Sequence, residues 1–311
     1  MAVLTGTATD HDDLLDDLIT FLTGLTSPES WTQLTSNITP PAGERHVYLR
    51  GPGLSGTDEI YINIRRYTNT VVNNSNNWEI RGALGFNADL DFDQQPGVSP
   101  AQYAILGSTT VPGISYRMVA NGRRFIIKPT LDQNNLEMPI YCGLILPYAT
   151  AAHHRYPLYI GANALDEGQS ANPTSTERLR GFHDPFNDWD NVAGTASFLH
   201  FDNSWVRVGN TRFVNSSRLN TTETDEGTRT WPWDINYNIR NYTDGSYSLI
   251  PGTFYTDVGG GNVYGDFDGV FWVSGTGNSA TAVITIDSTD YAVTNNPVDL
   301  GINDYAAIRL T

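Results

Sequence analysis

The chain has 311 residues, enough for one large or two ordinary domains, and its 39% hydrophobic and 11% aromatic content is typical of a globular protein. Its 18 basic and 34 acidic residues give a net charge of −16, which repels phosphate backbones and argues against a nucleic-acid partner. No signal-peptide pattern opens the chain and no run approaches the ~20 apolar residues of a membrane span, so we expect no membrane partner and synthesis in a reducing cytoplasm.

The first predicted element is an amphipathic helix that begins near residue 10. Thr9 or Asp10 can cap it, and Gly24 and Pro28 end it. Its apolar residues recur at spacings of three and four and form one stripe: Leu14, Leu15, Leu18, Phe21, Leu22 and Leu25. We therefore expect this stripe to pack against the rest of the protein.

The acidic residues at the start of this helix admit two interpretations. Asp10, Asp12 and Asp13 complement the positive end of the helix dipole. With His11 they could also form a metal cluster, but adjacent helical residues do not share a face. The sequence favours the helix-start interpretation.

Short strands follow the helix in the first half of the chain. They are predicted at residues 44–49, 59–67, 78–86, 116–120, 123–128 and 138–146. Asn121-Gly122 is a strong signal for a hairpin between the fourth and fifth of these strands. Residues 1–150 are therefore predicted to form an α+β module in which the helix packs on an antiparallel sheet.

The second half is predicted to be a separate, β-rich domain, residues 151–311, which makes the whole protein predominantly β. Residues 163–196 are rich in Asn, Gly, Asp and Pro and are interpreted as a long loop excursion. Strands are predicted at residues 205–208, 235–239, 247–250, 270–273, 282–286, 291–293 and 306–310. Their spacing and turn signals suggest a β-sandwich or a jelly-roll-like fold.

One segment matches a dinucleotide-binding motif. Gly275, Gly277 and Ala280 fit the pattern G-x-G-x-x-G/A, which requires a helix directly after it to hold the pyrophosphate. The residues that follow, 281–287, are rich in β-branched side chains and favour a strand instead. We predict a hairpin loop that binds no nucleotide and no cofactor.

Three groups of aspartates are candidates for functional sites. Asp89, Asp91 and Asp93 would share one face of a strand and could bind a hard cation such as Ca²⁺, although the turn residues after them favour a solvated edge that matters little to stability. A second group, with the same two interpretations, consists of Asp184, Asp188 and Asp190. Asp266 and Asp268, before Gly269, are interpreted as turn residues. No metal site is assigned.

No catalytic residue is assigned either. Trp231, Trp233 and Asp234 combine aromatic rings with an acid, as a glycosidase does, but no spacing singles out a pair of carboxylates. The doublet of His153 and His154 has no further metal ligand at a suitable spacing. Cys142 is the only cysteine and lies in an apolar run, so it is predicted to be a small buried hydrophobe.

The basic residues cluster in predicted strands. Arg65 and Arg66 form one doublet, and Arg123, Arg124 and Lys128 form the other cluster. We interpret them as charges that form ion pairs or lie at interfaces. They do not constitute a patch for nucleic acid.

Several stretches resemble virion structural proteins of tailed bacteriophages. They are turn-and-strand signatures at residues 48–62, 119–126, 143–149, 156–161, 265–275 and 303–310. The N-terminal helix and meander also resemble the small α+β modules of tail terminator and tail-completion proteins. The resemblance implies a non-enzymatic subunit of the phage tail, in a terminator or collar, or in a ring at the tail tip or baseplate.

The resemblance also implies partners. They would be further copies of the chain in a ring or repeated assembly, and other phage tail proteins, within the virion. The aromatic-rich run of residues 141–160, with Arg155, Tyr156 and Tyr159, is the predicted interface. One alternative is a carbohydrate-binding receptor module at the tail tip that stacks sugars on Trp231, Trp233 and Tyr237. A polysaccharide-degrading enzyme is a third interpretation.

Overall fold

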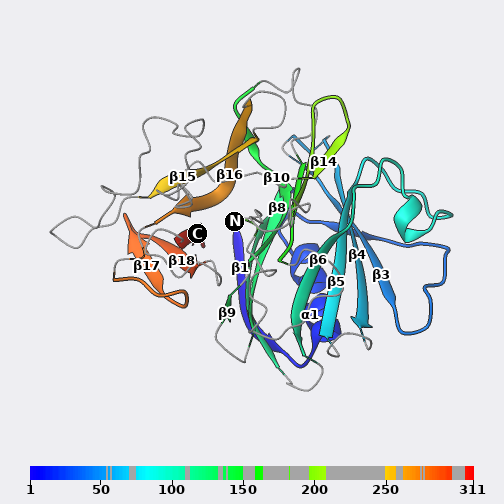
Figure 1. The fold of residues 1–311 in the computed structure, drawn as a ribbon, viewed down its shortest axis with the longest axis horizontal. Helices are drawn as coiled ribbons and strands as arrows, with labels where there is room; N and C mark the ends of the chain where they lie inside the picture. The colour runs from blue at the N-terminus through cyan, green and yellow to red at the C-terminus, as the bar shows by residue number, and fades with distance from the viewer. Residues whose placement is uncertain are drawn as a thin grey trace, which may run out of the picture.

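The fold is predominantly β, as predicted, with three antiparallel sheets and one α-helix among the described residues (Figure 1). The computed structural model describes residues 1–53, 55–56, 58–69, 75–108, 113–131, 136–137, 139–149, 158–163, 182, 196–207, 249–256, 262–273, 275, 277–295 and 305–311. In that part of the chain, no helix is both long and apolar enough to cross a membrane.

The largest sheet has eight strands. In spatial order they are β1 (Ala2–Ala8), β7 (Ile114–Asn121), β8 (Arg124–Leu131), β10 (Ile140–Leu144), β12 (Leu158–Gly161), β13 (Ala196–Leu199) and β14 (Trp205–Arg207), with β9 (Leu136–Glu137) pairing with β8. Strands from both sides of residue 150 therefore belong to one sheet. The division of the chain into domains at that residue stays a prediction.

Two smaller sheets accompany it. The five-stranded sheet contains, in order, β2 (Thr32–Leu34), β3 (Arg45–Gly51), β4 (Ile60–Asn69), β5 (Ser75–Ala83) and β6 (Gln102–Ser108). The six-stranded sheet contains β11 (Leu146–Pro147), β16 (Asn262–Trp272), β19 (Tyr305–Arg309), β18 (Thr289–Asn295) and β17 (Val283–Ile286), with β15 (Ile250–Thr256) pairing with β16. A 3₁₀ turn, η1 (Phe92–Gln94), lies between β5 and β6.

The predicted helix is confirmed as α1 (His11–Thr23). Asp10 caps it, because its Oδ1 accepts hydrogen bonds from the backbone N–H groups of Asp12 at 2.8 Å and Asp13 at 3.0 Å. Gly24 is its C-cap. The leucines of the apolar stripe are buried in the core between the eight-stranded and five-stranded sheets, and Phe21 packs against this core while partly exposed.

The eight-stranded sheet has an apolar core on each face. On β8, Phe125 and Ile127 belong to the core shared with α1 and the five-stranded sheet, whereas Ile126 belongs to the core shared with the six-stranded sheet. The same alternation occurs on β10, where Cys142 faces the first core and Tyr141 the second. Because both faces are covered at residues 125–127 and 140–142, apolar residues follow one another there without alternation, as in other sheets buried on two sides.

The hairpin predicted from Asn121-Gly122 forms between β7 and β8, shifted by one residue. Asn121 pairs with Arg124, so the two loop residues are Gly122 and Arg123. The Asn121 Oδ1 accepts hydrogen bonds from the N–H groups of Arg123 at 2.9 Å and Arg124 at 3.1 Å. Asn121 therefore stabilises the turn through its side chain from the position before the loop.

Candidate functional site

The dinucleotide-like segment lies in a connection between β16 and β17. A strand, β17, follows it as predicted, but the predicted hairpin is wrong. β16 pairs with β19 and β17 pairs with β18, so two strands separate β16 from β17 in the sheet. The segment thus joins strands that are neighbours in sequence and not in space.

The first aspartate group does not lie on a strand, because Asp89 is in a turn, Asp91 is the N-cap of η1 and Asp93 lies within η1. Asp89, Asp91 and Asp93 are all exposed, which agrees with the solvated interpretation. Asp89 accepts a hydrogen bond from Nδ2 of Asn37 at 2.7 Å, and Asp91 caps η1 by accepting one from the N–H of Phe92 at 3.0 Å. Within the described ranges, no three His, Cys, Asp or Glu side chains are grouped to hold a metal ion.

Several predicted site residues lie outside the described residues. They are His153, His154, Arg155, Tyr156, Asp184, Asp188, Asp190, Trp231, Trp233, Asp234 and Tyr237.

The prediction that Asp266 and Asp268 are turn residues is wrong, because both lie inside the long strand β16. Asp268 is buried, and its Oδ2 accepts hydrogen bonds from Asn121 Nδ2 at 2.8 Å and Arg123 Nη2 at 2.9 Å. The fully buried Arg124 donates from Nε to the Asp268 carbonyl oxygen at 3.0 Å. These contacts join the eight-stranded sheet to the six-stranded sheet.

The electrostatics of this cluster keep Asp268 ionised. Burial alone would raise its pKa, but the charge of Arg124, the hydrogen bond from Asn121 and the charge of Arg123 outweigh burial and lower the pKa below its ordinary value of 3.8. The ion-pair interpretation of the basic doublets is confirmed here, and also for Arg66, which pairs with Asp12 at 2.6 Å. We assign the Asp268 cluster a role in holding the sheets together.

The structure describes three tyrosines of the aromatic run predicted as an interface, and two of them lie in the core, whereas Tyr148 is 59% exposed. Tyr141 and Tyr159 are fully buried and belong to the core between the eight-stranded and six-stranded sheets. Their hydroxyls donate to the carbonyl oxygens of Leu144 at 2.6 Å and Phe182 at 2.9 Å. Tyr159 therefore cannot act as an exposed interface anchor.

An open sheet edge, on β1, is the structural feature best suited to contact another chain. All seven residues of β1 pair with β7, from Ala2 opposite Ala120 to Ala8 opposite Ile114. On its other side, β1 has no strand partner and no backbone hydrogen bond within the described part of the chain. Its sequence, AVLTGTA, contains no charged residue and no proline, and Val3 is 39% exposed.

The edge of the five-stranded sheet at β6 provides a contrast. Asn163 Oδ1 accepts a hydrogen bond from the N–H of Ile105 at 2.7 Å, and its Nδ2 donates to the Ile105 carbonyl at 3.1 Å. The N–H of Asn163 donates to the Tyr103 carbonyl at 3.2 Å. This edge is therefore blocked from within, whereas on the β1 edge the backbone groups, which have no partner among the described residues, could pair with another strand.

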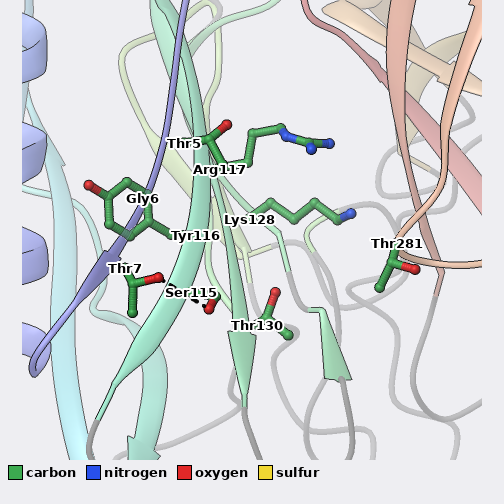
Figure 2. Close-up of a pocket in the computed structure, with 9 residues that line it drawn as sticks. All are labelled: Thr5, Gly6, Thr7, Ser115, Tyr116, Arg117, Lys128, Thr130 and Thr281. Atoms are coloured by element: carbon green, nitrogen blue, oxygen red, sulfur yellow. Dashed lines mark hydrogen bonds between the residues drawn. The ribbon is translucent and has the colours of Figure 1, made fainter.

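A polar cleft lies beside β1 (Figure 2). It has a volume of about 400 Å³ and lies where β1, β7 and β8 extend beyond their apolar core, opposite the connection before β17. Its lining consists mainly of hydroxyl and cationic side chains: Thr5, Thr7, Ser115, Arg117, Lys128, Thr130 and Thr281. The Lys128 Nζ donates to the carbonyl oxygens of Ala280 at 2.7 Å and Val293 at 2.6 Å, which ties the two sheets together at the cleft.

β1 was not predicted from the sequence. The open edge of β1 and the polar cleft beside it were therefore missed as well. The available signal in the sequence was the alternation of Thr5 and Thr7 with the non-polar residues Leu4, Gly6 and Ala8. No family model matches the chain, and neither does any curated protein sequence. The structural features above are therefore the basis for assigning a function.

Proposed function

We propose that the protein is a non-enzymatic structural subunit of a tailed-phage virion. It forms part of the tail, in a terminator or collar or in a ring at the tail tip or baseplate, through symmetric contacts with copies of itself and contacts with other tail proteins. The observation that carries the proposal is the open, uncharged edge of β1. The resemblance of the sequence to phage virion proteins supplies the biological setting.

The physical argument concerns how proteins protect sheet edges. A strand with unpaired N–H and C=O groups is a template for strand addition, and monomeric proteins block such edges with lysines, prolines, bulges or covering segments. β1 is seven residues long and contains no lysine and no proline. It pairs with β7 without a register shift, so it has no bulge. Strand addition at an open edge provides affinity through backbone hydrogen bonds. We assign this edge to an intersubunit contact.

We also propose a finer description of the fold. The core that the eight-stranded and six-stranded sheets share contains Val119, Ile126 and Tyr159 from one sheet and Phe267 and Ile308 from the other. Two antiparallel sheets that interleave their inner faces in this way have the organisation of a β-sandwich.

The test introduces a lysine at the open edge. Val3→Lys places a charge on β1, whereas the control Val263→Lys places the same charge on a 52% exposed valine of β16, a strand paired on both sides. Native mass spectrometry of the purified proteins should show an oligomer for the unchanged protein and for the control. For Val3→Lys, the fraction of protein in the oligomer should be at least tenfold lower. Circular dichroism and the melting temperature verify that each variant folds.

The virion part of the proposal has its own measurement. Quantitative mass spectrometry of purified phage particles should find the protein at a fixed copy number, and labelled antibodies should place it on the tail. A protein that is monomeric at all concentrations, or whose oligomers are unaffected by Val3→Lys, would overturn the role of β1. Particles that lack the protein and still form complete, infectious tails would overturn the structural role.

A further inference from the structure

One face of the eight-stranded sheet forms the floor of the cleft beside β1. Along β7 and β8, the side chains on this face change from apolar to polar. Val119 on β7 and Ile126 on β8 contribute to the apolar core shared with the six-stranded sheet. Two and four residues further along, the same face presents Arg117 and Ser115 on β7, and Lys128 and Thr130 on β8. The face thus changes along these strands from buried apolar side chains to hydroxyls and cations.

Arg117 is the unusual side chain of this cleft. Its guanidinium has no ion pair and no hydrogen bond in the described part of the chain, although the protein has 34 acidic residues and only 18 basic ones. The other arginines described above bind carboxylates or carbonyls within the fold. In Figure 2, the Arg117 and Lys128 side chains extend in the same direction, across the cleft toward the segment that contains Thr281.

The hydroxyl groups surround these two cations. Thr5 and Thr7 on β1 line the cleft beside Ser115, and the Thr7 and Ser115 hydroxyl oxygens are 3.5 Å apart. Thr281 lines it from the opposing segment and is exposed. Each hydroxyl can both donate and accept a hydrogen bond, whereas guanidinium and ammonium groups only donate. The lining therefore suits a ligand that has an anionic group and several hydroxyls.

We propose that this cleft binds a sugar acid, in which a carboxylate is attached to a polyhydroxylated ring. Arg117 holds the carboxylate, because the planar guanidinium matches a carboxylate with two parallel hydrogen bonds. The threonine and serine hydroxyls bind the ring hydroxyls, and Lys128 contributes positive charge to the same side of the cleft. The volume of about 400 Å³ lies within the range of small-molecule sites and is sufficient for one or two sugar rings.

The inference goes beyond the structural role and does not depend on it. The cleft side chains point between the two sheets, whereas strand addition would use the backbone edge of β1. The binding experiments below are performed on both the unchanged protein and Val3→Lys. Loss of assembly with retained sugar binding would therefore separate the two proposals.

The test is calorimetric titration of the full chain with digalacturonate, a sugar acid, and with maltose, its neutral counterpart in size. We expect saturable binding of digalacturonate, with at least tenfold weaker binding of maltose. Arg117→Gln should weaken digalacturonate binding at least tenfold, and Thr281→Val should weaken it severalfold. The matched control is Arg50→Gln, because Arg50 is also partly exposed but pairs with Glu59 outside the cleft.

Three results would overturn the proposal. The first is no saturable binding of digalacturonate by the folded protein. The second is equal affinity for digalacturonate in the unchanged protein and the Arg117→Gln variant, both with unchanged melting temperature. The third is displacement of digalacturonate by an equal concentration of acetate or inorganic phosphate, since the hydroxyl lining would then contribute nothing to recognition.

Discussion

His11 is a buried histidine in the first turn of α1, and neither of its ring nitrogens has a hydrogen-bond partner among the described residues. Burial, followed by the positive charge of Arg66, lowers its pKa from 6.5 to about 4, against the smaller opposing effects of Asp10 and Asp12. The folded protein therefore holds this ring neutral at a pH where the unfolded chain protonates it.

This shift makes stability depend on pH. As pH falls from 6.5 to about 4, the unfolded chain binds a proton on His11 that the folded protein does not, so the free energy of unfolding decreases. The expected loss from this residue is about 3 kcal/mol across that range. Denaturant titrations at several pH values should show a flatter dependence for His11→Phe than for the unchanged protein. An identical pH dependence in the two proteins would contradict the assignment.

The folded pKa of Asp268 is lowered as well, and because this group is a carboxylate its contribution to stability is present above 3.8. That contribution disappears as pH falls through the folded pKa, which lies below 3.8. The acid sensitivity expected from Asp268 therefore begins where the sensitivity expected from His11 has ended. The sequence shows Asp10 and Asp12 beside His11, but it does not show that His11 and Asp268 are buried or that Arg66 and Arg124 are their charged neighbours.

At the scale of elements, β12 shows why a strand's environment decides the role of its aromatic residues. Tyr159 has Phe254 and Phe267 at ring-centroid distances of 5.3 and 4.8 Å, and Ile160 packs on the opposite face of the sheet. The one aromatic residue of β12, Tyr159, is thus part of a core and not of a surface.

Truncating this tyrosine tests that assignment. Tyr159→Ala should lower the free energy of unfolding by roughly 3–5 kcal/mol, as expected for removal of a buried aromatic ring. Tyr159→Phe keeps the ring and loses only the hydrogen bond to the Phe182 carbonyl, so it should cost about 1 kcal/mol. Urea unfolding of both variants is the measurement. A loss below 1 kcal/mol for the alanine variant would contradict the buried placement.

At the scale of the whole molecule, the two halves of the sequence contribute strands to one eight-stranded sheet. Leu158 and Ile160 of β12 and Leu199 of β13 complete the core that contains α1, and the six-stranded sheet covers the opposite face. Removing residues beyond 150 would expose Val119, Ile126 and Tyr141 on one face of the remaining strands.

We therefore expect a fragment of residues 1–150 to be much less stable than the full chain. It should unfold at a lower denaturant concentration and bind a dye specific for exposed apolar surface. Circular dichroism melts and dye fluorescence of the fragment and the full chain provide the comparison. A fragment that melts cooperatively at the temperature of the full chain would instead support an independent domain that ends at residue 150.

The sequence alone determined the features that depend on neighbouring residues. The start of α1 at Thr9 or Asp10, its apolar stripe, its end near Gly24 and a hairpin around Asn121-Gly122 are local, because each depends on contacts within a few residues. The predominance of strands was likewise predictable from composition and alternation. The buried state of Cys142 followed from the apolar run around it.

The tertiary structure alone decided which strands are adjacent and which edges remain open. The separation of β16 from β17 by two strands, the burial of Tyr159 and the pairing of Asp268 with Arg123 join residues far apart in the chain. The open edge of β1 and the cleft beside it depend on where each sheet ends. The sequence of β1 indicates that it can pair as a strand, but its partner β7 lies more than a hundred positions away in the chain.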